Sequence, residues 1–300
     1  MAAPVIKVIA GPTASGKSAL AIETAQTCGG VIINADALQV YDALPLLTAR
    51  PAADDMQAAP HMLYGVIPPT EICSARRWTD LAVAAIQQTL AGGRTPILVG
   101  GTGLYLRTLM EGLSPVPDVP PEIRAMMIAR QRAMGNPVFH AAFSAHDPVM
   151  AARLHPNDTQ RLIRAWEVLE ATGKSLAAWQ AQPPQPPVPE WTYDVLVLDP
   201  PRDVLYDRCN RRFLMMMEQG ALEEVETYDQ RMARGEVLDT GGVTQALGFW
   251  PLRAGLHGVL SREEAITQAQ THTRQYAKRQ VTWLKNQVKE GGSIIRLQRY

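Results

Sequence analysis

Short apolar segments alternate with helical segments along the first third of the chain. Val5–Ala10, Val31–Asn34 and Pro96–Val99 are apolar runs typical of buried parallel strands. Capping residues and glycine pairs bound the segments between and after them, which predict helices. These helices are expected at Gly16–Gln26, Ser74–Leu90 and Gly103–Met110. The alternation predicts an α/β fold with a parallel sheet flanked by helices.

The pattern changes between two proline-rich segments, Ser114–Pro121 and Gln182–Glu190. From Glu122 to Gln180 the apolar spacing is helical throughout. It is clearest at Asp158–Thr172, where apolar side chains recur on one face. Prolines cannot continue a helix, so the two segments are expected to bound an all-helical insertion at residues 114–190.

After the second proline-rich segment the chain returns to the first pattern. Tyr193–Leu198 predicts another strand, and two long helices are expected at Val204–Met217 and Ala265–Lys289. The simplest organisation is one α/β core formed by residues 1–113 and 191–300, interrupted by the helical insertion.

Composition narrows the class of protein. The 300 residues, 46% of them hydrophobic, suffice for about two domains, and 29 basic residues balance 29 acidic ones. Nucleic acid could therefore bind only to local basic surface. Three cysteines lie far apart, and the sequence contains no apolar run of membrane-spanning length. A cytoplasmic protein without a membrane partner is expected.

One glycine-rich segment predicts a phosphate site. Residues Gly11–Ser18 fit the pattern GxxxxGK[ST] and lie between a predicted strand and a predicted helix. In such a loop, backbone N–H groups and the helix N-terminus surround an anion. Lys17 would neutralise phosphate oxygens, and Ser18 could hold Mg²⁺. The motif does not reveal which phosphate compound binds.

The strand at Pro96–Val99 runs into Gly100-Gly101-Thr102-Gly103, without the acid that P-loop ATPases and GTPases use to hold Mg²⁺. This absence argues against ordinary nucleotide hydrolysis. The Thr102 hydroxyl could stabilise a leaving diphosphate oxygen, although it could also cap a helix. Asp36, at the end of the second strand, could ligate metal or accept a proton, or could be an ordinary turn residue.

The last predicted helix is basic. Residues 265–289 contain no acid, and Arg274 and Lys278 share one helix face, with Tyr276 and Trp283 interleaved. This segregation of charge favours contact with a polyanion such as RNA or diphosphate, although a solvated basic face is the alternative.

Eight segments together resemble the tRNA dimethylallyltransferase family, in the family's order and across nearly the whole chain. They are GPTASGKS (11–18), NADALQVYDALPLLTARP (34–51), HMLYGVIPP (61–69), GGTGLYL (100–106), NDTQRLIRAWEVLEATGKS (157–175), RRFLMMMEQGALEEV (211–225), TQALGF (244–249) and TRQYAKRQVTWLK (273–285).

The resemblance implies a P-loop core that binds dimethylallyl diphosphate with Mg²⁺, and a helical insertion that binds the tRNA anticodon stem-loop. In that family, N6 of the adenine immediately 3′ of the anticodon, position 37, attacks C1 of the dimethylallyl group. Diphosphate leaves and N6-isopentenyladenosine remains. The enzyme is expected to act as a monomer.

The resemblance also implies roles for individual residues. Asp36 would be the general base, and Thr102 would hydrogen-bond the oxygen that bridges the dimethylallyl group and diphosphate. Ser18 would coordinate the metal. Diphosphate would contact Gly11, Thr13, Ala14, Ser15, Gly16, Lys17, Ser18 and Arg212. The tRNA would contact Asp36, Ala37, Leu38, Gln39, Thr102, Arg124, Gln160, Arg161, Leu162, Ile163, Arg164, Gln245, Arg274, Lys278, Arg279 and Gln280.

Five positions depart from the family's pattern: Ala37, Arg50, Met62, Phe249 and Trp250 stand where the family usually has Ser, Lys, His, Tyr and Lys. Three other functions stay open from the residues alone. A small-molecule P-loop kinase would leave the insertion and the basic helix unexplained. A relative that prenylates free AMP would not need the insertion. A non-catalytic RNA-binding ATPase is disfavoured by the missing acid after the Pro96–Val99 strand.

Overall fold

A computed structural model describes residues 3–287 and 294–297. The chain divides into two compact units. The core unit consists of Met1–Met110 and Val188–Tyr300, and the helical unit is Glu111–Pro187. The sequence placed these transitions three residues later, at 113 and at 190.

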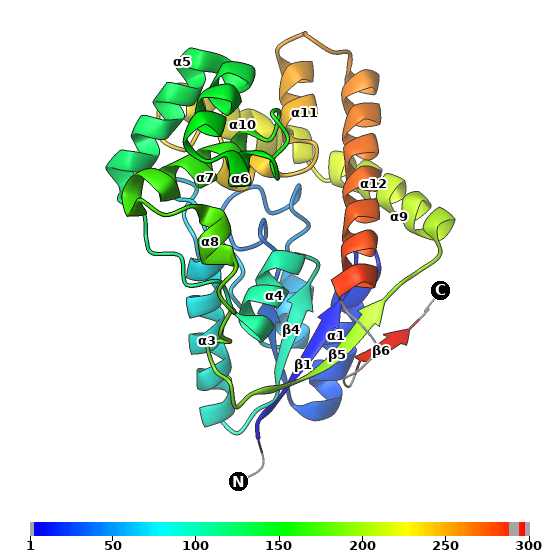
Figure 1. The fold of residues 1–300 in the computed structure, drawn as a ribbon. Coiled ribbons are helices and arrows are strands. Elements are labelled where there is room, and N and C mark those ends of the chain that lie inside the picture. The colour runs from blue at the N-terminus through cyan, green and yellow to red at the C-terminus, as the bar shows by residue number, and fades with distance from the viewer. Residues whose placement is uncertain (1–2, 288–293, 298–300) are drawn as a thin grey trace. The chain divides into compact units, whose positions relative to one another are not determined.

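The core unit contains one parallel sheet of six strands in the order β3-β2-β4-β1-β5-β6. The predicted α/β fold is therefore confirmed. Because all the strands are parallel, their carboxyl ends meet at one edge of the sheet, as the arrowheads of β1, β4 and β5 show in Figure 1. The strands are β1 (Val5–Ala10), β2 (Val31–Asn34), β3 (His61–Met62), β4 (Pro96–Gly100), β5 (Thr192–Leu198) and β6 (Ile294–Leu297).

Both faces of the sheet are buried, which explains why its strands are continuous apolar runs. One face, which includes Ile97, packs against α1 (Lys17–Cys28). The opposite face, which includes Leu98, packs against α3 (Ala75–Ala91). Successive strand residues point to opposite faces, so neighbours in one strand belong to two different cores.

The helices that follow β5 correct the sequence analysis. The two predicted helices are α9 (Arg202–Glu218) and α12 (Arg262–Gln287), and the expected end at Lys289 lies outside the described residues. The prediction missed two further helices, α10 (Ala221–Ala233) and α11 (Phe249–Leu256). It also missed α2 (Ala53–Ala58), η1 (Gly242–Gln245), β3 and β6, most of which are too short for a periodicity to emerge.

The helical unit has its own core. It contains α5 (Pro121–His146), α6 (Pro148–Ala151), α7 (Thr159–Thr172) and α8 (Leu176–Gln180). Helix α5 is kinked where Gly135 takes a φ of 69°, two residues before Pro137. The side chains that fill this core include Phe139, Phe143, Leu162 and Trp166. In the part of the chain that the structure describes, no helix is both long enough and apolar enough to cross a membrane.

Candidate active site

Three loops at the carboxyl edge of the sheet bring the predicted chemistry together. Residues 11–16 follow β1, Asp36 follows β2, and residues 101–103 follow β4. This edge is where ligands bind in open α/β sheets. The glycines of the third loop allow close contacts. A Cβ on Gly101 would meet the Gln280 amide nitrogen at 2.3 Å, and one on Gly103 would meet the Trp283 ring at 2.3 Å.

The phosphate loop opens into a cavity of about 390 Å³. Gly16, in the left-handed conformation with φ 90°, starts helix α1, so the helix N-terminus faces the same space. Three arginines of α9 line the opposite side, although the sequence had indicated only the last of them. The lining side chains include those of Ser15, Lys17, Ser18, Arg208, Arg211 and Arg212.

Lys17 and Arg212 are the two cations at the centre of this site. Among the described residues, neither Lys17 nor Arg212 forms an ion pair with a carboxylate. Burial and the nearby Arg212 guanidinium lower the pKa of Lys17 to about 8, although Asp36 acts in the opposite direction. Burial likewise lowers the pKa of Arg212. A bound anion would relieve both effects, because it would favour the charged forms.

Ser15 and Thr13 of the phosphate loop differ in how many of their hydrogen-bonding groups already have a partner in the protein. The buried Ser15 hydroxyl has no hydrogen-bond partner in the described part of the chain, so it is free to meet a phosphate oxygen. Thr13 is engaged: its N–H donates to Gln280 Oε1 at 2.8 Å, and its hydroxyl accepts from Arg212. Only the hydroxyl proton of Thr13 is left for diphosphate.

Asp36 is held in a fixed turn. Its Oδ1 accepts from the Leu38 N–H at 3.0 Å. The fully buried Asn34 side chain accepts from the Asp36 N–H at 2.9 Å and donates to the Asp36 carbonyl at 3.1 Å. No described residue donates a hydrogen bond to the second carboxylate oxygen, which is therefore available to a substrate. Sequence reasoning missed Asn34, whose polar side chain at the end of an apolar strand was the available signal.

Thr102 lies beside this turn. Its Oγ1 accepts from the Ala37 N–H at 2.9 Å. The contact with Ala37 uses backbone, so the replacement of the family's usual serine leaves it intact. Because the Thr102 hydroxyl accepts in this contact, its proton stays available as a donor.

A narrow pocket of about 40 Å³ joins these groups within the core unit. Its polar lining includes Thr13, Asp36, Arg212 and Tyr276. Its apolar lining comes from Leu38, Leu47, Phe213, Met216 and Leu247. A carboxylate, a guanidinium and an apolar wall therefore face one small space, which suits a ligand with an anionic end and a hydrocarbon end.

Helix α12 supports the site with side chains that the sequence analysis assigned elsewhere or left unassigned. Gln280 was expected to contact tRNA, but it is buried. Its amide donates to the Gly101 carbonyl at 3.0 Å and accepts from Thr13. The side chain therefore links two loops of the site. The spacing of Thr273, Ala277, Gln280 and Leu284, all buried, was the signal for an inward helix face.

Among the other residues of the core unit that were predicted to contact RNA, some side chains are exposed and others form hydrogen bonds within the protein. Gln245, Lys278 and Arg279 are exposed. Arg274 donates to Asn210 Oδ1 at 2.6 Å and to the Thr271 hydroxyl at 2.9 Å. Gln39 donates to the carbonyls of residues 48 and 49 at 3.0 and 2.7 Å, so its amide nitrogen holds a loop rather than facing a ligand.

The predicted RNA contacts of the helical unit centre on one buried carboxylate. Glu167 is fully buried and accepts from Arg124 at 3.2 Å and from Arg164 at 2.7 Å. Sequence reasoning missed Glu167. Gln160 and Arg161 are exposed and Ile163 is partly buried. Leu162, also predicted to contact tRNA, is fully buried in the core of this unit.

Fold and site together define a P-loop protein whose phosphate cradle lies beside a carboxylate and a threonine hydroxyl instead of a nucleotidase acid. Comparison with known proteins supports this class. The sequence profile of the IPP transferase family matches residues 39–287. The chain belongs to the IPP transferase family.

Individual relatives support the assignment. A tRNA dimethylallyltransferase of Rhodospirillum centenum is 50% identical over 284 residues, which is 94% of this chain and 89% of the relative. The crystal structure of a tRNA isopentenylpyrophosphate transferase from Bacillus halodurans superposes with a TM-score of 0.66 at 32% identity, covering 98% and 89% of the two chains. A eukaryotic dimethylallyltransferase acting on tRNA superposes with a TM-score of 0.80 at 28% identity, covering 98% and 74%.

Proposed function

We propose that this protein is a tRNA dimethylallyltransferase, which transfers the dimethylallyl group of dimethylallyl diphosphate to N6 of adenine 37. The observation that carries the proposal is the narrow pocket in which Asp36, Arg212 and an apolar wall meet beside the phosphate cavity. A prenyl diphosphate would place its anionic end in the cavity and its hydrocarbon end against the wall. The electrophilic carbon would then lie near the carboxylate.

The chain's own residues account for the reaction. The Asp36 carboxylate would accept a proton from the N6 amine, a poor nucleophile because its lone pair is delocalised into the ring. A bond forms between N6 and C1 as the bond from C1 to the bridging oxygen breaks, and the electron pair leaves with diphosphate. Thr102 would donate a hydrogen bond to that oxygen, while Lys17 and Arg212 neutralise the charge of the leaving group.

The site also fits Mg²⁺. Ser18 offers an exposed hydroxyl at the wall of the phosphate cavity, and Mg²⁺ usually combines few protein ligands with substrate phosphates and water. No cluster of three acidic, histidine or cysteine side chains forms a cage elsewhere among the described residues. Ser18 would therefore hold the ion together with the substrate. When bound, Mg²⁺ supplies positive charge that improves diphosphate as a leaving group.

The RNA contacts belong to the same proposal. Lys278 and Arg279 on α12, with Gln245, would meet tRNA from the core unit. Arg124, Arg161 and Arg164 would meet the anticodon stem-loop from the helical unit, through phosphate contacts that carry most of the affinity. The cytoplasmic location and the monomeric state remain predictions.

Mass spectrometry of nucleosides tests the function. The protein is incubated with dimethylallyl diphosphate, Mg²⁺ and bulk tRNA that lacks the modification. We expect an adenosine heavier by one dimethylallyl group, and no product when AMP replaces tRNA. Product from AMP would assign the protein to the relatives that make free prenylated nucleotides. Consumption of ATP without a prenylated product would favour a kinase and leave the family resemblance as one of fold.

A further inference from the structure

The narrow pocket is bounded on one side by a loop, Leu44–Ala49, rather than by a helix or strand. Leu47 and Thr48 of this loop line the pocket together with Asp36. The pocket holds about 40 Å³, room for only a few water molecules. A five-carbon group must therefore displace part of its lining. How far the 44–49 loop yields then determines how large a group the pocket accepts.

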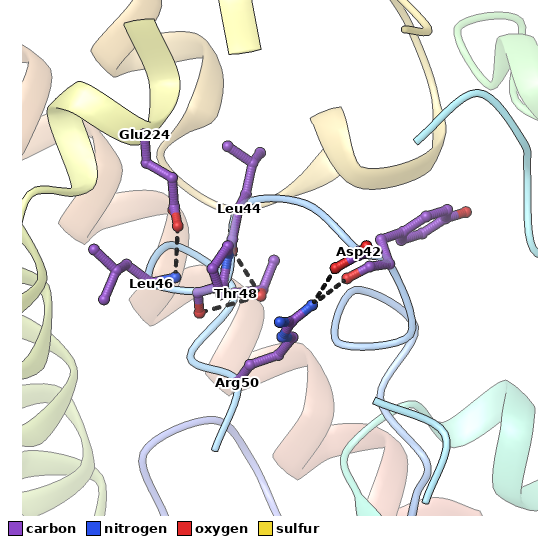
Figure 2. Close-up of polar contacts among 8 residues, drawn as sticks. Asp42, Leu44, Leu46, Thr48, Arg50 and Glu224 are labelled. Carbon is purple, nitrogen blue, oxygen red and sulfur yellow. Dashed lines mark hydrogen bonds and ion pairs between the residues drawn. The ribbon is translucent and has the colours of Figure 1, made fainter. Parts of the chain in front are cut away.

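The loop is restrained from a distant part of the chain. Glu224, in the first turn of α10, accepts the Leu46 N–H at 2.9 Å and the Leu47 N–H at 3.0 Å, one with each carboxylate oxygen. Figure 2 shows this carboxylate pointing at the loop backbone from above. Two charge-assisted hydrogen bonds to adjacent N–H groups fix both the position and the direction of this segment.

Contacts within the loop complete the restraint. Gln39 donates to the carbonyls of Thr48 and Ala49, and the Thr48 hydroxyl donates to the Leu44 carbonyl at 2.8 Å. Arg50, at the loop's end, donates to the Tyr41 carbonyl at 3.0 Å and lies 3.4 Å from an Asp42 carboxylate oxygen. Figure 2 shows Arg50 pointing toward Asp42. Both ends are therefore held, and the Glu224 carboxylate holds the middle.

The backbone needs these contacts. Leu44 and Ala49, which flank the segment, take φ values of 50° and 56°, a left-handed conformation that costs free energy for residues other than glycine. Such residues persist only where their surroundings over-determine them. Behind the loop, a Cβ on Gly248 would lie 3.3 Å from Leu47 Cδ1, so glycine at this position leaves the space that the Leu47 side chain uses.

The Glu224 carboxylate is itself sensitive to its surroundings. Burial raises its pKa, while the two backbone N–H groups and the Arg50 guanidinium lower it. Loss of the carboxylate would leave two partly buried N–H groups without their acceptor. The loop would then lose its central restraint while the phosphate cavity on the other side of the pocket stays unchanged.

We propose that Glu224 is a positioning residue that fixes the 44–49 loop and so limits the length of the prenyl chain that the pocket accepts. The inference rests on the proposed function and extends it to substrate selection. Glu224 does not contact the substrate. It acts through Leu47, whose side chain would lie against the hydrocarbon end.

The test compares transfer to tRNA from dimethylallyl diphosphate and from the ten-carbon geranyl diphosphate. We expect the wild type to prefer the five-carbon donor strongly, and Glu224→Ala to lower the ratio of the two kcat/KM values by about tenfold. Affinity for inorganic diphosphate should stay within about twofold of the wild type, because the phosphate cavity is untouched. The matched control is Glu223→Gln, since this exposed neighbour forms no hydrogen bond or ion pair with the loop among the described residues.

Two further variants keep the test decisive. Glu224→Gln preserves the shape and one acceptor oxygen, so it should fold and give a smaller shift in the same direction. Leu47→Ala enlarges the wall directly and should also favour the longer donor. An active wild type with an unchanged ratio in Leu47→Ala and in a folded Glu224 variant would overturn the inference. A wild type that transfers neither donor would instead contradict the proposed function.

Discussion

The two units treat their buried and partly buried charges in opposite ways. In the helical unit the fully buried Glu167 receives two arginines, Arg124 and Arg164. In the core unit Lys17 and Arg212 lie in the phosphate site, and no carboxylate in the described part of the chain forms an ion pair with them. The first arrangement is complete without a ligand, whereas the second is not.

This difference separates two uses of positive charge. Arginines that share a buried carboxylate are held in place, so they can present their remaining donors in a fixed direction. A lysine whose pKa is lowered by burial is costly to the free protein and is stabilised when an anion arrives. Changes in the core unit should therefore affect chemistry and diphosphate binding, and changes in the helical unit should affect RNA affinity.

The largest effect is expected for Asp36→Ala. Loss of a general base costs about 10²- to 10⁴-fold in rate, and no second carboxylate lines the narrow pocket. Single-turnover transfer should fall by that factor, while tRNA affinity in a filter-binding assay changes little. Transfer at the wild-type rate would remove Asp36 from the mechanism. A parallel loss of tRNA binding would break the separation between the units.

Lys17→Met should abolish diphosphate binding and yet stabilise the free protein. The pKa of Lys17 falls from its ordinary 10.5 to about 8, so the unfolded chain binds more protons between these values. The stability of the wild type should therefore rise with pH across this window, by up to about 3 kcal/mol. The methionine variant should lack that rise and unfold at a higher temperature at pH 7. Equal pH dependence of denaturant unfolding in both proteins would contradict this account.

Of the three variants, Glu167→Gln should have the smallest effect on function. It changes the helical unit, whereas the other two change the core unit. The amide keeps one acceptor oxygen but loses the charge that holds two arginines, which costs about 1–2 kcal/mol of stability. We expect tRNA affinity to fall by about three- to tenfold, with the single-turnover rate at saturating tRNA unchanged. Glu170→Gln, an exposed glutamate on the same helix, is the matched control. A slower chemical step in Glu167→Gln would contradict the assignment of RNA affinity to the helical unit and chemistry to the core unit.

Patterns within short stretches of the sequence predicted the strands, the helix ends, the phosphate loop and the insertion, because these depend mainly on residues that are close in the chain. The strands β1, β2 and β4 follow from apolar runs that are buried on both faces, and the glycine and proline signals located helix ends within a few residues. The phosphate loop needed only its own sequence, since its chemistry resides in the backbone and one lysine. The insertion was visible because prolines bound it and its apolar period differs.

Contacts between distant residues could not be predicted in the same way. Gln280 joins Thr13 and Gly101 across 267 and 179 positions, and Glu224 reaches Leu46 across 178. Nothing near these residues in the chain announces a partner. Burial within a helix was more accessible: the apolar spacing around Leu162 and Gln280 places both on inward faces, which a strict use of the helical period would have detected.

Isothermal titration calorimetry with dimethylallyl diphosphate, without tRNA, tests most directly whether a bound anion raises the lowered pKa of Lys17. Titrations in two buffers of different ionisation enthalpy give the number of protons taken up on binding. The phosphate protons of the ligand are lost well below pH 9, so uptake there reports on the protein. With a pKa of about 8 in the free protein, Lys17 should take up close to one proton at pH 9 and almost none at pH 7. Binding at pH 9 without proton uptake would contradict the account.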